Sequence, residues 1–211
     1  MIKISEIIEH EIEQRSEEWF AIRTGKLTGS HFAEIMPSDK SRVKWTLAQE
    51  KAVYKIAAEI MTGLSGDKTF INEAMQWGID HEEEARKEVE MYFMDSSREC
   101  GIFQRGQYIA SSPDAIIGDN DMTLEIKCPS SAVHLKYFKD PESLWKEYKW
   151  QVLGEMYCTG LDKGIIASYD PRFIDESKRL VVYEPKDYSD DLIKLEERLG
   201  EVELKIQEII S

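Results

Sequence analysis

The alternation of apolar and polar residues along the chain predicts helices and short strands in a mixed order. Between residues 41 and 62, Val53, Ile56 and Ile60 recur at helical spacing and would line one face of a helix. Comparable patterns predict helices at 16–23, 30–36, 71–94, 142–158 and 189–210, and strands at 107–117, 122–128, 164–169 and 179–184. We therefore expect an α/β fold with a central mixed β-sheet flanked by helices, in one domain over residues 1–211.

Composition and charge narrow the range of partners. The chain has 211 residues, 42% of them hydrophobic, and a net charge of −14. Such an acidic protein repels nucleic acid and anionic membranes unless its basic residues gather on one surface. No apolar run reaches the ~20 residues that span a bilayer, and the first residues lack a signal-peptide core, so we expect a cytoplasmic protein. The three cysteines lack the pair spacing of zinc or iron–sulfur sites.

Residues 111–129, SSPDAIIGDNDMTLEIKCP, place charges inside two apolar runs. The sequence GDND at 118–121 favours a turn, and a four-residue loop there would form a β-hairpin. Side chains alternate along a strand, so Glu125 and Lys127 would share one face. The hairpin would pair Ile117 with Met122, Ile116 with Thr123, Ala115 with Leu124, and Asp114 with Glu125.

Two carboxylates that face each other across a hairpin repel, so we expect a cation between Asp114 and Glu125. Lys127 would supply part of the positive charge and a divalent metal ion would supply more. Carboxylate oxygens suit Mg²⁺ or Mn²⁺ better than zinc. The alternative is a surface hairpin whose charges are solvated.

A third carboxylate, Glu82, falls on the inward face of the expected helix 71–94, in line with Ala85 and Val89. An inward carboxylate needs a partner, and a metal shared with the hairpin carboxylates would be one. His81 is an alternative ligand, although a single histidine beside an acidic run is more typical of a solvated surface.

These residues together resemble a known family. Asp114 followed by Glu125-x-Lys127, with an acidic helix before them, is the pattern of PD-(D/E)XK nucleases, and the chain is similar to the lambda exonuclease family of YqaJ-type viral recombinases. Ala115 departs from the glycine that is common after the aspartate in that family, which affects local backbone freedom more than chemistry. The resemblance rests on RSEEWFAIRTGKLTGSHF, WGIDHEEEAR, SPDA, LEIKCP, WQVLGEMY and YDPR.

The resemblance implies a restriction-endonuclease-like core and assigns roles to the residues. Two metal ions, Mg²⁺ or alternatively Mn²⁺, would be held by Asp114, Glu125, the main-chain carbonyl of Ile126 and Glu82. Such ions lower the pKa of a bound water and neutralise charge on a phosphodiester. The catalytic residues would be Asp114, Glu125, Lys127 and Gln151, with Lys127 positioning or activating the attacking water and Gln151 binding that water or Lys127.

The resemblance also implies that Arg23, Ser30 and Ser112 bind the 5′-terminal phosphate of the digested strand. Arginine presents a fork of donors to phosphate oxygens. Ser30 could cap a short helix at HFAEIM, whose N-terminus would add free N–H groups and partial positive charge. A plain helix start is the alternative. We interpret Trp19 and Phe20 as core residues. Lys26, Trp45 and the lysines and aromatics of 136–149 could contact the duplex backbone.

The expected function is that of the family: a Mg²⁺-dependent 5′→3′ exonuclease that digests linear double-stranded DNA and leaves 3′ single-stranded tails for recombination. The resemblance implies a homotrimeric ring around DNA, a single-strand-annealing protein as partner, and a phage protein acting in the bacterial cytoplasm. A structure- or site-specific endonuclease, an RNA-directed nuclease and a non-catalytic DNA-end-binding protein are the alternatives. Three mutually repelling acids speak against the last.

Overall fold

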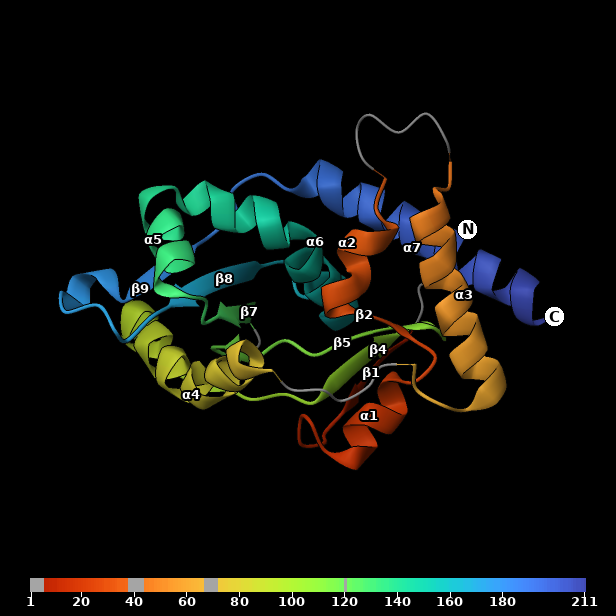
Figure 1. Ribbon diagram of the computed structural model, residues 1–211, viewed down its shortest axis with the longest axis horizontal. Helices are drawn as coiled ribbons and strands as arrows, with labels where there is room; N and C mark the ends of the chain where they lie inside the picture. Colours follow the sequence, from red (N-terminus) through yellow and green to blue (C-terminus); the bar gives the residue numbers. More distant parts are fainter. Residues whose placement is uncertain (1–5, 38–43, 67–71, 120) are drawn as a thin grey trace.

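The computed structural model describes residues 6–37, 44–66, 72–119 and 121–211, and it has a mixed α/β fold (Figure 1). The strands form two sheets, with the orders β1-β4-β5-β2 and β3-β6-β7-β8-β9. Both sheets contain parallel and antiparallel pairs. The predicted fold class, a mixed α/β fold with flanking helices, is confirmed, and its strands divide between two sheets.

The strands are short, and more of the described residues lie in helices than in strands. The strands are β1 Ile7–His10, β2 Leu27–Thr28, β3 Ser97–Arg98, β4 Ile102–Arg105, β5 Ile109–Ser111, β6 Ala115–Ile117, β7 Met122–Lys127, β8 Gly164–Tyr169 and β9 Leu180–Tyr183. The helices are α1 Glu17–Arg23, α2 Phe32–Ile35, α3 Leu47–Thr62, α4 Glu73–Phe93, α5 Ser131–Lys139, α6 Pro141–Thr159 and α7 Ser189–Ile210, with 3₁₀ turns η1 Gly29–His31 and η2 Glu176–Lys178.

The β6–β7 hairpin has the register that the sequence predicts. Ala115 faces Leu124, and the next two pairs towards the turn also match the prediction. The ladder ends at Ala115, so the fourth predicted pair, Asp114 with Glu125, is not part of it, and the Asp114 N–H donates a hydrogen bond to the Leu124 carbonyl oxygen at 3.0 Å instead. Strand β7 pairs in parallel with β8 on its other side. This strand therefore lies in the middle of the five-stranded sheet.

The strand expected over 107–117 is two strands. β5 belongs to the four-stranded sheet and β6 to the five-stranded sheet. The chain crosses from one sheet to the other at residues 112–114, where Pro113 has no N–H to donate to a ladder. Ser112 and Asp114 therefore lie at the junction of the two sheets.

Helix ends follow local signals. Thr46 and Gln49 form a capping box at the start of α3, and Gly63 ends the helix with a left-handed φ of 68°. Asn72 caps α4 through a hydrogen bond from the Met75 N–H. The expected starts of these helices, 41–43 and 71, lie outside the described residues. Helix α5 and strands β1 to β4 were not predicted.

Helix α6 is the central helix of the larger core. Leu144, Val152 and Leu153 are fully buried on it. A Cβ added at Gly154 would lie 2.0 Å from the Phe32 ring, so α2 packs directly on the α6 backbone. This contact brings the segment around Gly29–His31 to α6, as Figure 1 shows for α2 and α6. Among the described residues, no helix combines the length and the apolar character needed to cross a membrane.

Candidate active site

Strand β7 carries Glu125 and Lys127 on one face of its sheet. Leu124 and Ile126 point to the other face, where they pack against buried residues of α4. Glu125 is only 3% exposed, and Lys127 is half-buried. The predicted alternation along the strand is confirmed, and it places two charged side chains within the fold.

Asp114 joins them from the junction of the two sheets. Its Oδ2 accepts a hydrogen bond from the Ile126 N–H at 2.7 Å, which fixes the carboxylate beside β7. Burial, and then the negative charges of Glu125 and Glu82, raise the pKa of Asp114 well above its ordinary value. Asp114 is thus near enough to each of the other two predicted carboxylates to be repelled by it.

Lys127 supplies the positive charge beside β7. Its Nζ donates hydrogen bonds to Glu125 Oε1 at 2.5 Å and to Gln151 Oε1 at 3.3 Å, and it lies 4.8 Å from the ring centroid of Tyr148. Burial alone would lower the pKa of Lys127, but the carboxylates of Glu125 and Asp114 outweigh it and raise that pKa. The predicted contact between Gln151 and Lys127 is present.

Glu155, which the sequence analysis did not select, lies one helical turn after Gln151 on α6. It is fully buried, and neither of its oxygens has a donor among the described residues; Glu125 Oε2 also lacks one. Glu155 contacts Glu125, and a hydrogen bond joins the two carboxylates when one is protonated. Burial, and then the charge of Glu125, raise the pKa of Glu155 well above its ordinary value. A charged residue between apolar neighbours on a helix was the signal for it.

Glu82 and Asp114 line a cavity of about 400 Å³, which we call the acidic cavity. Arg15 also lines it and forms an ion pair with Glu82. This pair joins residues far apart in the sequence, so no local sequence pattern predicts the contact of Arg15 with the acidic cavity. The remaining charged side chains of the acidic cavity are Glu9, Glu11, Glu13, Arg98 and Glu99.

The carboxylates fit a hard divalent cation in chemistry, although they are now engaged with other groups. Within the part of the chain that the structure describes, no three Asp, Glu, His or Cys side chains form a ready set of metal ligands. Glu82 is paired with Arg15, and Glu125 with Lys127. The buried Glu125 Oε2 without a donor and the repulsion from Asp114 are what a bound cation would relieve. His81 contacts Glu84 and the Trp77 ring.

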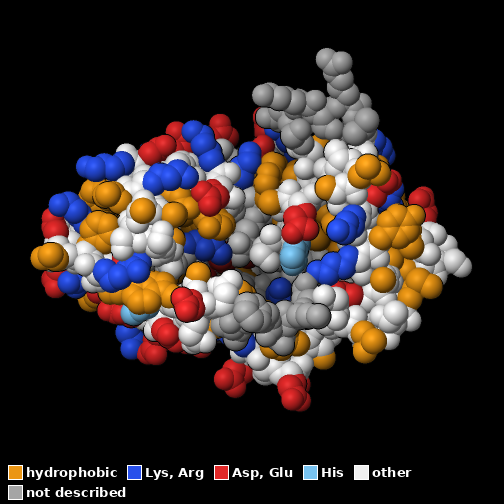
Figure 2. Space-filling model, viewed as in Figure 1, with side chains coloured by type: hydrophobic (Ala, Val, Ile, Leu, Met, Phe, Trp, Pro, Cys, Tyr) orange, Lys and Arg blue, Asp and Glu red, His pale blue; other side chains and the backbone are white. Residues whose placement is uncertain are grey.

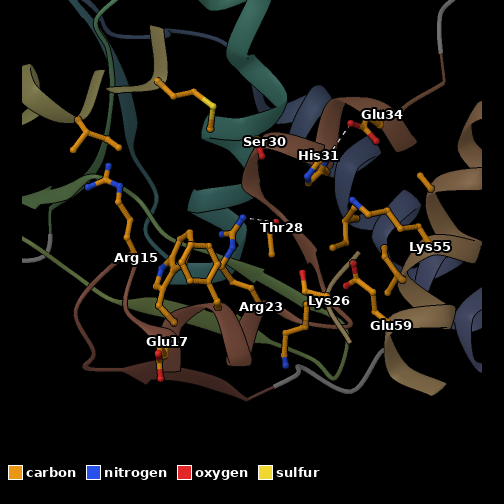
Figure 3. Close-up of a pocket in the computed structure, with 18 residues that line it drawn as sticks. Arg15, Glu17, Arg23, Lys26, Thr28, Ser30, His31, Glu34, Lys55 and Glu59 are labelled. Carbon is orange, nitrogen blue, oxygen red and sulfur yellow. Dashed lines mark hydrogen bonds and ion pairs between the residues drawn. The ribbon is translucent and has the colours of Figure 1, made fainter. Parts of the chain in front are cut away.

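A second cavity of about 770 Å³ holds two of the predicted phosphate-binding residues, Arg23 and Ser30 (Figure 3). Arg23 Nη2 donates to Thr28 Oγ1 at 2.9 Å, and its guanidinium lies 4.0 Å from the ring centroid of Trp19. Ser112 accepts a hydrogen bond from the Trp19 indole at 2.9 Å, so it supports Arg23 through that ring. We call this cavity the cationic cavity because four basic side chains line it, Arg15, Arg23, Lys26 and Lys55, against three glutamates, Glu17, Glu34 and Glu59.

Three local interpretations need correction. Ser30 is not a helix cap: it lies inside η1, and the caps of η1 and α2 are Thr28 and His31, neither with a side-chain capping bond. Helix α2 has only 4 residues, too few to present a helix dipole to an anion. Trp19 and Phe20 are not core residues, since both line the cationic cavity and Phe20 is 38% exposed.

The residues predicted to contact the DNA backbone lie in three different places in the fold. Lys26 lines the cationic cavity. Trp45 is covered by Arg198 of α7, whose guanidinium lies 3.5 Å from the ring centroid, so Trp45 packs between helices. Lysines of 136–149 lie on α5 and α6, where basic side chains gather on the surface shown in Figure 2.

The segment beside Ser30 connects the two cavities. A Cβ added at Gly29 would lie 3.7 Å from Gln151 Cγ and 3.9 Å from Glu155 Oε1. Gln151 in turn binds Lys127. The segment that contains Ser30, a predicted phosphate-binding residue, therefore packs directly against side chains that surround Lys127.

A family model agrees with this arrangement. The model of the YqaJ-like viral recombinase domain matches residues 18–162. The chain belongs to this family. The matched range includes every predicted metal, catalytic and phosphate-binding residue and leaves Arg15 outside. A comparison with curated protein sequences gave no significant match.

Solved structures of exonucleases are similar over most of the chain. The alkaline exonuclease LHK-Exo of Laribacter hongkongensis is 27% identical, with a TM-score of 0.70 over 92% of this chain and 96% of its own. Its complex with dAMP is 28% identical, with the same TM-score and coverage. A phage-related exonuclease from Haemophilus somnus 129PT, 17% identical, has a TM-score of 0.71 over 88% of this chain and 95% of its own, and shows the shared fold. Family membership and these neighbours support a nuclease.

Proposed function

We propose that the protein is a Mg²⁺-dependent exonuclease that digests linear double-stranded DNA from 5′ ends and leaves 3′ single-stranded tails. The observation that supports this most is the direct packing of the cationic cavity on the carboxylate site through Gly29 and Gln151. A DNA terminus held by Arg23 would present its first phosphodiester next to Lys127. LHK-Exo, a relative named as an exonuclease, binds dAMP, a mononucleotide.

Asp114, Glu125, the carbonyl of Ile126 and Glu82 would hold Mg²⁺ or Mn²⁺, ions that acidify a bound water and neutralise phosphate charge. Lys127 keeps its proton because carboxylates raise its pKa, so it acts as a fixed positive charge beside the reacting phosphate. Gln151 orients the lysine amine through its Oε1. Lys127 in turn orients the attacking water.

The carboxylates must be ionised to hold a cation, and the raised pKa of Asp114 makes that ionisation incomplete at low pH. Cation binding and activity would therefore increase as the pH rises. The name of the relative LHK-Exo, an alkaline exonuclease, is in line with this direction.

Arg23 would bind the 5′-terminal phosphate. Its guanidinium is already held by Thr28 and by the face of Trp19, so little side-chain freedom would be lost on binding. Ser30 lines the same cavity and would donate its hydroxyl to the phosphate. Ser112 holds the Trp19 indole, so its contribution to phosphate binding would be indirect.

The net charge of −14 makes assembly part of this proposal. A homotrimeric ring would turn the basic side chains of α5, α6 and the cationic cavity towards DNA and leave the acidic surplus facing solvent. The 3′ tails would pass to a single-strand-annealing recombination protein in the bacterial cytoplasm.

The test is digestion of one DNA sequence in two forms, end-labelled linear duplex and covalently closed circular duplex, with and without Mg²⁺. We expect release of nucleotides from the 5′-terminated strands of linear DNA in Mg²⁺ and survival of the circle, because the cavity binds a terminus. Cutting of both forms at similar rates would make the protein an endonuclease.

A further inference from the structure

Arg15 lines both the acidic and the cationic cavity. Figure 3 shows it at the opposite side of the cationic cavity from His31 and Lys55, which come from η1 and α3. Its side chain is 41% exposed, so it is not packed in place. Arg15 is therefore near the predicted metal ligands and near the proposed phosphate site at once.

The guanidinium of Arg15 is engaged with Glu82. The two side chains form an ion pair, and the Glu82 side chain remains 26% exposed. An arginine and a divalent cation both seek the same carboxylate oxygens, and two positive charges on one carboxylate repel. A cation bound by Glu82 would therefore compete with Arg15 for that carboxylate.

The backbone at Arg15 also indicates a functional position. Its φ is 68°, in the left-handed region that residues other than glycine seldom adopt. Such conformations persist where the surroundings impose them, and they cluster at ligand sites and switches. Here the conformation directs an arginine from the segment before α1 towards α4.

We propose that Arg15 is a positioning residue that couples the two cavities. In the cation-free protein it neutralises Glu82, and when a divalent cation takes that carboxylate the guanidinium turns to the 5′-terminal phosphate in the cationic cavity. Each ligand would then favour the other, because coupling between two binding sites is reciprocal. The inference rests on the proposed function and extends it to the order in which the site assembles.

The first test measures Mg²⁺ binding by calorimetry in the absence of DNA. Removing the competing cation should tighten binding, so Arg15→Gln should bind Mg²⁺ at least about fivefold tighter than wild type. Arg15→Gly, which suits the left-handed backbone, should do the same and covers poor folding of the first variant. Arg98→Gln is the matched control: it removes a guanidinium from the same cavity, but one that pairs with Glu9.

Arg98→Gln should change Mg²⁺ affinity less than about twofold. Unchanged or weaker binding by folded Arg15→Gln and Arg15→Gly would overturn the proposal, as would an equal gain in Arg98→Gln. If an Arg15 variant binds Mg²⁺ and wild type does not, the proposal is supported. If none of the proteins binds Mg²⁺, the proposal is overturned.

The second test measures the affinity for a 5′-phosphorylated duplex by fluorescence anisotropy, with and without Ca²⁺, an oxygen-seeking cation used here in place of Mg²⁺ to limit digestion. Ca²⁺ should tighten binding by wild type several-fold more than binding by Arg15→Gln. Equal Ca²⁺ effects in the two proteins would refute the coupling. If linear DNA is not digested, the proposed function fails, while the Mg²⁺ measurement without DNA still decides the competition at Glu82.

Discussion

The acidic and the cationic cavity differ in how their charges are balanced. In the acidic cavity, six carboxylates stand against Arg15 and Arg98, and the glutamates that these arginines bind are Glu82 and Glu9. In the cationic cavity, Arg23 is held by Thr28 and Trp19, two neutral side chains. A cavity with an excess of acidic side chains and a cavity with a small excess of basic ones thus lie side by side, in a protein of net charge −14.

The comparison indicates that the two cavities are prepared for their ligands in different ways. Ion pairs with Arg15 and Lys127 offset part of the negative charge of the acidic site, and a bound cation would take over part of that role. Contacts with Thr28 and with the Trp19 ring orient the Arg23 guanidinium, so little of its side-chain freedom would be lost when it binds an anion. The acidic site would gain its active form when a cation binds, whereas Arg23 of the proposed phosphate site is already held by Thr28 and Trp19.

The largest effect is expected from removing the charges at β7. Lys127→Ala, Asp114→Ala and Glu125→Ala should each lower Mg²⁺-dependent nucleotide release by about a thousandfold or more, because each removes a group that would hold the cation or offset phosphate charge. Release of acid-soluble nucleotides from linear duplex measures this, with circular dichroism to verify folding.

Lys87→Ala is the control for the loss of a lysine. Lys87 pairs with Glu83 on the outer face of α4, away from both cavities, and its removal should leave the rate within about twofold. Wild-type rates for any of the three β7-site variants would remove the acidic site from the chemistry.

A smaller effect is expected at the cationic cavity. Wild type should digest 5′-phosphorylated ends about tenfold faster than 5′-hydroxyl ends, since a charge-assisted hydrogen bond contributes about 1.5–3 kcal/mol and ~1.4 kcal/mol is a factor of ten. Arg23→Ala should lose most of this preference by slowing the phosphorylated substrate. Initial rates of both enzymes on both substrates measure it.

Lys146→Ala separates recognition of the end from general attraction to DNA. Lys146 is exposed on the outer face of α6 and pairs with Glu142. Its loss should slow both substrates equally. If Arg23→Ala behaves in the same way as Lys146→Ala, the cationic cavity does not recognise the terminal phosphate.

The parts that the sequence predicts well are those set by local rules. The turn at 118–121 fixes the hairpin length, and alternation along β7 then assigns the face of each side chain, so the register is confirmed. Helical spacing likewise brings Gln151 to the site. The family resemblance supplied three candidate phosphate-binding residues, of which Arg23 and Ser30 share a cavity.

The parts that the sequence misses depend on contacts between distant segments. The pairing of Arg15 with Glu82 and the burial of Glu155 behind Glu125 arise only when α4, α6 and β7 have packed together. Strands β2 and β3 have 2 residues each, too few for a periodic signal. The division into two sheets follows from a break of three residues, 112–114, inside an otherwise strand-like run.

The smallest effect concerns Glu155, which belongs to the acidic side of the comparison but is fully buried. Its raised pKa means that the folded protein binds a proton there more tightly than the unfolded chain does. This contribution to stability is complete below the ordinary pKa of 4.5 and is lost as the pH rises through the higher folded value. The contribution therefore decreases towards alkaline pH, where an ionised Glu155 would be a buried negative charge that repels Glu125.

Glu155→Gln removes that charge, so the metal-free variant should melt a few degrees higher than wild type at pH 8 and no higher at pH 4.5. For a chain of this size, ~1 kcal/mol corresponds to about 2–4 °C. Thermal melts followed by circular dichroism at both pH values measure the difference, with the exposed Glu83→Gln as a control that should show no gain. Added Mg²⁺ should reduce the gain, because a cation held by Glu125 and Asp114 offsets the same repulsion. An equal shift at both pH values would mean that Glu155 acts through packing rather than through its charge.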